Sequence, residues 1–441
     1  MFIVIDPSEV YNKFIMTTFQ INDTNLREIS HSETLLINEA QDKLRESNNK
    51  IFKFGFGQSP FSPPSLAVES LKSHAKEHDY LPVAGLMECR EAVAKAHQSY
   101  RANIDRSDIV IAPGSKMIIY AVMACYKNAT VLLPQPSWVS YAPQASLLNH
   151  NVQLIPTNFD AQWKINPVSL AAACELITDN TPKILVLNYP NNPTGMTYTA
   201  SELEGLAEVA RKYNILIISD EIYSWLNHEG SHTSIAEFYP EGTFVTTGLS
   251  KWCGAGGWRF GAGIFPLNAS NEFKVTYNGI ASETYSTTAA PVQFAATDIY
   301  NNMDQLSSFI STQRSILKSL SSEIVGKLTA TNVRIHQPDG GFYIFPDFSN
   351  YSEKLTAKGI HTAEEFCVEL LNTKGVAMLP ASAFGFDQSQ LFTRMCYVDF
   401  NGAKAIEAIN SGEALSAAFF DEYAPSVIQG IDALCNYLAS L

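Results

Sequence analysis

Lys251 stands in the stretch of this chain that is most informative about its chemistry. It follows Ser250 and precedes a glycine-rich tract, with Arg259 eight residues further on. A lysine forms imines with aldehydes only when its amine is deprotonated, which requires a desolvated or cation-rich site that lowers its pKa. Glycines let a bulky cofactor lie close to the backbone, and a guanidinium can hold a phosphate. The stretch predicts a Schiff-base lysine, with an ordinary lysine in a glycine-rich surface loop as the alternative.

A second candidate site contains a carboxylate and a phenol that follow a predicted strand. Asp220 comes directly after a predicted buried strand over 215–219, and Tyr223 lies three residues beyond it. A carboxylate in a site that excludes water is costly unless it meets a cation. The protonated nitrogen of a pyridine ring is such a cation, and the pairing keeps the ring an effective electron sink. The alternative reading makes Asp220 the N-cap of a helix.

Three loops add groups that could bind the rest of a flat, phosphorylated ligand. Gly114, Ser115 and Lys116 open a predicted helix, whose N–H groups and dipole favour a phosphate, although such a serine also serves as an ordinary cap. Asn192 lies in a run with two prolines and a glycine, which could hold its amide rigidly against a ligand oxygen or form a bare turn. Trp138 could stack on a ring, although a place in the core is commoner for tryptophan.

The segments between these loops predict an α/β fold. Apolar runs typical of buried strands alternate with amphipathic segments predicted as helices over 116–126 and 200–213, which favours a largely parallel sheet covered by helices on both faces. Ligands of such folds bind outside the carboxyl ends of the strands. The candidate residues follow predicted strands in the sequence, so they are expected at these ends. The predicted strands are 109–112, 130–133, 183–188, 215–219 and 243–247.

A second region, from about residue 330 to the C-terminus, predicts a smaller α+β domain. It has strand-like segments over 333–336, 342–346 and 394–399, together with helical segments. A chain of 441 residues exceeds what one hydrophobic core usually supports. We therefore expect a large domain over 60–325 and a small domain formed by 1–59 and 326–441.

Bulk composition limits the classes of partner. The net charge of −14 argues against nucleic acid, because phosphate backbones need a basic surface. Seven widely spaced cysteines without a Cys-x-x-Cys pair favour reduced thiols in a cytoplasmic protein, with no metal site. The N-terminus does not resemble a signal peptide, and no stretch approaches the roughly 18 apolar residues of a membrane span. We expect a soluble, cytoplasmic protein.

The order and spacing of the motifs resemble those of one enzyme family, the class I/II pyridoxal-phosphate-dependent aminotransferases of the aspartate aminotransferase type, which have the fold type I of such enzymes. The resemblance extends from near residue 30 to near residue 400 and so covers most of the chain. The matching motifs are Gly57-Gln58-Ser59-Pro60-Phe61, Tyr80-Leu81-Pro82-Val83-Ala84-Gly85, Asn192-Pro193-Thr194-Gly195, Asp220-Glu221-Ile222-Tyr223, Ser250-Lys251 to Arg259, Gly340-Gly341-Phe342-Tyr343 and Arg394-Met395-Cys396.

The resemblance implies a role for each candidate around the cofactor ring. Lys251 would be the Schiff-base lysine and the base that transfers the substrate proton, and Asp220 would pair with the pyridine nitrogen. Tyr223 and Asn192 would hydrogen-bond the phenolic oxygen, and Trp138 would stack on the ring. The catalytic residues implied are Lys251, Asp220 and Tyr223.

The resemblance also implies how the phosphate and the substrate are held. Tyr80 would reach the phosphate of a neighbouring subunit, which implies a homodimer with shared active sites. Arg394 would clamp the substrate α-carboxylate, and the backbone of Gly57 would approach the substrate. The other implied phosphate ligands are Gly114, Ser115, Lys116 and Arg259, and the substrate-binding set also includes Trp138 and Asn192.

The activity implied is ping-pong transfer of an amino group from an L-amino acid to a 2-oxo acid. Some aspartate enzymes have an arginine near 281–287 for a second carboxylate, and this chain has none there. Aromatic residues expected near the mouth (Phe56, Phe61, Tyr285) favour aromatic substrates, whereas Ser286 or Lys116 could bind aspartate or glutamate. A lyase that performs β- or γ-elimination with the same lysine and aspartate is the alternative. A non-catalytic module is disfavoured because the expected catalytic positions are filled.

Overall fold

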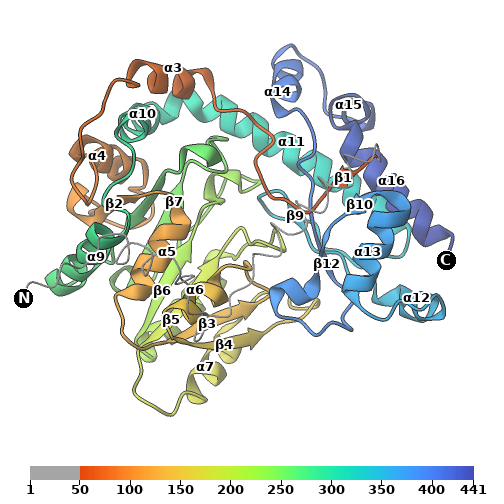
Figure 1. Ribbon diagram of the computed structural model, residues 1–441, viewed down its shortest axis with the longest axis horizontal. Helices are drawn as coiled ribbons and strands as arrows, with labels where there is room; N and C mark the ends of the chain where they lie inside the picture. The colour runs from red at the N-terminus through yellow and green to blue at the C-terminus, as the bar shows by residue number, and fades with distance from the viewer. Residues whose placement is uncertain (1–49) are drawn as a thin grey trace, which may run out of the picture. The chain divides into compact units, whose positions relative to one another are not determined.

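A seven-stranded sheet forms the centre of the larger part of the chain in the computed structural model, which describes residues 50–441 (Figure 1). The strands lie in the order β2-β8-β7-β6-β5-β3-β4. All neighbours are parallel except β8, which runs antiparallel to both β2 and β7. The strands are β2 (Ile109–Ala112), β3 (Thr130–Gln135), β4 (Asn151–Pro156), β5 (Lys183–Asn188), β6 (Ile215–Asp220), β7 (Thr243–Gly248) and β8 (Gly261–Ile264).

Both faces of this sheet are covered by helices, which explains the nearly continuous apolar runs of its strands. Successive residues of a strand point to opposite faces, so that Val131 and Leu133 of β3 pack in one apolar cluster and Leu132 in another. The first cluster includes α5 (Ser115–Ala124), α6 (Tyr141–Leu147) and α9 (Asn271–Thr284), and the second includes α7 (Pro167–Glu175) and α8 (Ala200–Lys212).

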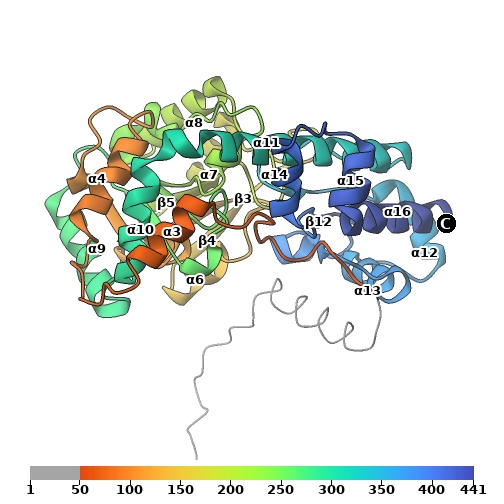
Figure 2. The same cartoon turned by 90° about the horizontal axis from the view of Figure 1, so that it is seen from above.

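Three further helices pack together, and one long helix follows them and runs to the C-terminal region. Helices α3 (Ser65–Ser73) and α4 (Met87–Ala96) both pack against α10 (Ala290–Asn301). The 28-residue helix α11 (Met303–Ala330) then extends to the C-terminal region, where it packs against α14 (Gly402–Asn410) and α16 (Pro425–Ala439) (Figure 2).

The C-terminal region contains two small sheets. Strand β1 (Phe52–Lys53) pairs in parallel with β10 (Val376–Ala377), and the other sheet has the order β11-β12-β9. The pairing of β1 fixes the start of the segment that runs on to Gly57. The remaining elements are β9 (Tyr343–Ile344), β11 (Leu379–Pro380), β12 (Thr393–Cys396), α12 (Ser352–Ala357), α13 (Ala363–Lys374), α14 (Gly402–Asn410), α15 (Ala417–Tyr423) and α16 (Pro425–Ala439).

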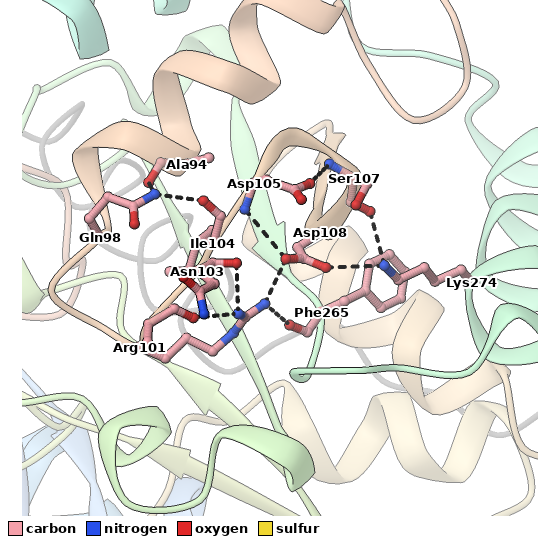
Figure 3. A network of polar contacts seen from close by, with 11 residues as sticks. Ala94, Gln98, Arg101, Asn103, Ile104, Asp105, Ser107, Asp108, Phe265 and Lys274 are labelled. Carbon is pink, nitrogen blue, oxygen red and sulfur yellow. Dashed lines mark hydrogen bonds and ion pairs between the residues drawn. The ribbon is translucent and has the colours of Figure 1, made fainter.

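A buried ionic network fixes the end of β2 that lies away from the candidate residues (Figure 3). Asp108 accepts a 2.8 Å bond from Nη2 of Arg101 on Oδ2 and a 3.1 Å bond from Nζ of Lys274 on Oδ1. The side chain of Arg101 is only 3% exposed, so that its charge depends on this carboxylate and on backbone carbonyls, including that of Phe265. The network joins the chain after α4, the start of β2 and the first turn of α9.

The sequence-based prediction of a mostly parallel α/β fold is confirmed, with differences in detail. The strands at 109–112 and 183–188 are confirmed to the residue, whereas the predicted strand at 333–336 is wrong: Arg334 forms only an isolated bridge with Asp347. The prediction missed β4, which is an edge strand with mostly exposed side chains, and β8, half of which is glycine. Residues 1–49 of the proposed small domain lie outside the described residues.

Candidate functional site

A cavity of about 470 Å³ lies at the carboxyl edge of the seven-stranded sheet. The polar residues that follow β2, β3, β5, β6 and β7 meet here because parallel strands end at one edge, and Arg259 joins them because it precedes the antiparallel strand β8. Of the predicted site residues, those that line the cavity are Gly57, Ser115, Lys116, Trp138, Asn192, Asp220, Tyr223, Lys251, Arg259 and Arg394. Gly114 and Tyr80 do not line it.

Lys251 enters the cavity between the sheet and the C-terminal region. Its Nζ donates a 2.8 Å hydrogen bond to the carbonyl oxygen of Gly57 and lies over the rings of Tyr223 and Phe342, at 5.4 and 5.6 Å from their centroids. Burial, with a smaller contribution from the nearby charge of Arg394, lowers the pKa of Lys251 to about 8. The amine is therefore partly deprotonated near neutral pH, as nucleophilic attack on an aldehyde requires.

Asp220 is the last residue of β6 and is 3% exposed. Tyr141 donates a 2.6 Å hydrogen bond to its Oδ2, and within residues 50–441 no cation forms an ion pair with it. Burial raises the pKa of Asp220 to about 6, against the lowering effects of the Tyr141 hydrogen bond and the charge of Lys251. No α-helix begins at Asp220, so the N-cap alternative is wrong. A buried carboxylate of this kind fits a ligand that presents a cationic N–H group.

The N-terminus of α5 forms a cradle for an anion. Gly114, at φ 93°, precedes α5 and offers no side-chain cap to its free N–H groups. A Cβ at Gly114 would lie 2.2 Å from Nη2 of Arg259, and a Cβ at Gly261 would lie 2.6 Å from the backbone nitrogen of Ser115. Arg259, at φ 56°, donates only to backbone carbonyls among the contacts of the described chain. Backbone N–H groups, a hydroxyl and a guanidinium are the donors that a phosphate requires.

Arg394 lies on β12, on the opposite side of the cavity, and is 1% exposed. Its Nη1 donates to Oδ1 of Asn192 at 3.2 Å and its Nη2 to the carbonyl of Gly55, whereas its Nε has no hydrogen-bond partner in residues 50–441. The guanidinium lies 5.3 Å from the centroid of the Tyr343 ring. A buried arginine without a carboxylate partner in the described chain is a site for a ligand carboxylate.

Two tyrosines of the cavity were not among the predicted site residues, and three residues expected near the mouth or the substrate lie outside the cavity lining. Tyr141 and Tyr343 line the cavity; Tyr343 ends the motif Gly340-Gly341-Phe342-Tyr343, and Tyr141 lies three residues after Trp138. Of the aromatic residues expected at the mouth, Phe56 lines the cavity, whereas Phe61 is buried against Phe400. Tyr285 also lies outside the lining, and so does Ser286. The other lining residues are Gln58, Ser140, Asn188, Ile222, Ser250, Gly256 and Gly257.

The sequence model of the family "aminotransferase class I and II" matches residues 49–409, and the chain belongs to this family. It is 30% identical over 372 residues to an aspartate aminotransferase of Bacillus sp. (strain YM-2), which covers 82% of this chain and 91% of the relative. It is also 30% identical to an asparagine–oxo-acid transaminase of Streptococcus mutans, over 81% of this chain and 90% of the relative. The protein is thus an aminotransferase, and the family depends on pyridoxal phosphate.

Solved structures show the same fold. The aspartate aminotransferase of Thermus thermophilus with maleate superposes with a TM-score of 0.78 at 22% identity, covering 93% of this chain and all (100%) of that chain. The aspartate aminotransferase of Thermotoga maritima gives a TM-score of 0.77 at 25% identity, covering 93% and 98% of the two chains. The fold type I that the sequence resembles is therefore confirmed.

Two searches of residues 50–441 bear on other classes of site. No helix in this range is long and apolar enough to cross a membrane. No cluster of His, Cys, Asp or Glu in the same range could hold a metal ion.

Proposed function

We propose that the cavity binds pyridoxal 5′-phosphate and that Lys251 is the residue to which the cofactor is joined. The observation that carries this proposal is Asp220, a buried carboxylate without a cationic partner in the described chain, set in the same cavity as a lysine of lowered pKa. The protonated nitrogen of the pyridine ring supplies the missing cation. When bound, the cofactor withdraws electrons from the Cα atom of the amino acid, which makes the Cα–H bond acidic.

The remaining contacts divide between the ends of the cofactor and the substrate. We assign the phosphate to the start of α5, with Gly114, Ser115 and Arg259 as its donors. We assign Trp138 to cover the ring, and Tyr223 and Asn192 to donate to its phenolic oxygen, since all three line the cavity. We also assign Trp138 and Asn192 to the substrate-binding set, since both line the cavity and Asn192 accepts a hydrogen bond from Arg394.

The chain's own groups then account for amino-group transfer. Arg394 binds the α-carboxylate of the amino acid, which orients Cα relative to Lys251, and the backbone of Gly57 lies next to both. With the cofactor bound, the Lys251 amine would be the base that removes the proton from Cα of the amino acid and returns it during the transfer. Release of a 2-oxo acid and return of the amino group to a second 2-oxo acid complete the ping-pong cycle. No relative named above is a lyase, so elimination has no support.

Lys116 points to an acidic substrate. Its Nζ lies 4.9 Å from the centroid of the Trp138 ring, and it forms no ion pair with a carboxylate of residues 50–441. Burial and the charge of Arg259 lower its pKa. Because Arg259 and the start of α5 suffice for the phosphate, Lys116 is available for the second carboxylate of aspartate or glutamate. Of the aromatic residues expected at the mouth, only Phe56 lines the cavity, and the relatives named above are, by name, transaminases of aspartate or asparagine.

Tyr80 supports a homodimer. Its side chain is 93% exposed, an unusual state for a large ring. We propose that Tyr80 of each subunit reaches the phosphate site of the other subunit and so completes that subunit's cavity. The division into a large domain over 60–325 and a small domain over 1–59 and 326–441 belongs to the same proposal. The seven cysteines are all free, which agrees with a cytoplasmic location.

The absorbance spectrum of the purified enzyme, titrated with a panel of L-amino acids, tests this function. A visible cofactor band that is lost on addition of aspartate or glutamate, and returns with 2-oxoglutarate or oxaloacetate, supports it. Replacement of Lys116 by Met should weaken the response to acidic amino acids about tenfold while sparing alanine. The absence of a band after addition of pyridoxal phosphate would contradict the proposal.

A further inference from the structure

A second tyrosine hydroxyl lies next to the one assigned to the cofactor. The hydroxyl oxygens of Tyr343 and Tyr223 are 2.6 Å apart, and the two side chains are 1% and 3% exposed. Their rings meet edge to face with centroids 5.5 Å apart, so neither hydroxyl can turn away without disturbing the packing. Tyr343 lines the cavity from β9, whereas Tyr223 follows β6.

The protons of this pair can be arranged in only two ways. Burial raises the pKa of both hydroxyls well above the ordinary value, so both are neutral at neutral pH. A neutral hydroxyl carries one proton, and only one proton lies in the bond between the two oxygens. If Tyr223 donates to Tyr343, it has no proton left for the cavity. If Tyr343 donates, the proton of Tyr223 is free for an acceptor in the cavity, and the bond received from Tyr343 strengthens it as a donor.

Tyr343 also contacts the two groups that flank the substrate position. The Arg394 guanidinium lies over its ring at 5.3 Å from the centroid. A Cβ at Gly57 would lie 2.2 Å from the Tyr343 hydroxyl oxygen, so the ring sets how closely this backbone approaches. Gly57 in turn accepts the 2.8 Å bond from Lys251. The Tyr343 side chain therefore contacts three groups assigned to the site. These are Tyr223, which is assigned to the cofactor, Arg394, which is assigned to the substrate carboxylate, and Gly57, which binds Lys251.

Charged and titratable groups face the pair from three sides. Asp220 lies at the end of β6, Lys251 lies beyond the end of β7, and Arg394 and Cys396 lie on β12. All four remain in place when only the hydroxyl of Tyr343 is removed. Any change in the absorbance titration on removal of that hydroxyl therefore comes from the hydrogen bond between Tyr343 and Tyr223.

We infer that Tyr343 is a positioning residue for the amino-transfer reaction: its hydroxyl directs the proton of Tyr223 toward the phenolic oxygen of the cofactor, and its ring supports Arg394. The inference rests on the proposed function. A donor at the phenolic oxygen stabilises its anionic form. A weaker donor therefore raises the pH at which the visible absorbance band of the bound cofactor changes.

The test compares holoenzyme variants by pH titration of that band and by steady-state kinetics. Y343F should raise the midpoint by roughly half a pH unit and leave the KM for the amino acid within about twofold, since the ring under Arg394 remains. Y343L should raise the midpoint similarly and increase KM about tenfold, because the cation–π contact is lost as well. Tyr277 provides the control, since its buried hydroxyl lies 3.4 Å from that of Tyr285, outside the cavity lining.

The outcomes separate this inference from the proposed function. A wild-type band that titrates, with a Y343F midpoint equal to that of wild type, would overturn the positioning role alone. The same shift in Y277F would show that any buried hydroxyl has this effect, and it would overturn the inference too. A wild-type protein without any cofactor band would instead contradict the proposed function.

Discussion

The hydroxyl of Tyr141, the first residue of α6, donates a 2.6 Å hydrogen bond to Oδ2 of Asp220, the last residue of β6. The bond joins the segment after β3 to the end of β6, with β5 between these two strands. It lowers the pKa of Asp220 and so opposes the effect of burial, which raises that pKa. Tyr141 thus favours the ionised carboxylate, the form that a cationic ring nitrogen requires.

Removal of this hydroxyl should weaken cofactor binding. In Y141F the pKa of Asp220 rises above its value of about 6, so a smaller fraction is ionised at neutral pH. A hydrogen bond to a charged group is worth about 1.5–3 kcal/mol, which corresponds to a loss of roughly tenfold or more in affinity for pyridoxal phosphate. Absorbance titration of cofactor-free enzyme measures it. Y239F, which removes a buried hydroxyl outside the cavity lining, should bind like wild type.

Capture of the cofactor should depend on pH through Lys251. Its pKa is lowered to about 8, mainly by burial, so the ammonium form predominates below that pH and the free amine above it. Only the amine attacks an aldehyde. The rate at which cofactor-free enzyme develops the visible band should therefore rise with pH, with a midpoint near 8. A midpoint near that of an ordinary lysine, above 10, would show that the cavity does not activate the residue.

The length and shape of the Arg394 side chain should matter as well as its charge. R394K keeps a positive charge but loses the planar fork that binds a carboxylate through two bonds, and it also loses the contact over the Tyr343 ring. We expect KM for the amino acid to rise about 10- to 100-fold with a smaller change in kcat. Arg211, which forms an exposed pair with Glu241, gives the matched control, and R211K should have wild-type kinetics.

The network of Asp108 should affect stability rather than activity. D108N leaves Arg101, with a side chain 3% exposed, without its carboxylate partner, and loss of one partner of a buried pair costs about 3–5 kcal/mol. Urea denaturation of the holoenzyme measures the change. E241Q breaks the Arg211–Glu241 pair, whose side chains are both 48% exposed, and should cost less than about 1 kcal/mol. Equal losses in the two variants would contradict the role of burial.

The sequence predicted the parts of the site that local pattern determines. Asp220, Lys251 and Ser115 follow strands or open a helix, so strand periodicity alone places them at one edge of the sheet. Arg394 was identified only through its motif, because β12 lies in the separate three-stranded sheet. The Tyr343 hydroxyl pair depends on contacts between residues 120 positions apart, which no local pattern reveals.

The strand errors have a related cause. The strand β4 lies at the edge of the sheet and keeps several polar and exposed residues, so it lacks the apolar run of a buried strand. The segment 333–336 has a strand-like composition but pairs with its neighbour only at Arg334. In both segments, the presence or absence of a neighbouring strand to pair with determined whether a strand forms, rather than the β-propensity of the residues.

Reductive trapping tests the central claim most directly. Borohydride reduction of the holoenzyme converts the bond between the cofactor and its lysine into a stable amine, and peptide mass spectrometry then locates the modified residue. We expect the cofactor mass on the peptide that contains Lys251, and on no other lysine. A label on Lys116, or no label on an enzyme that still transfers amino groups, would contradict the assignment.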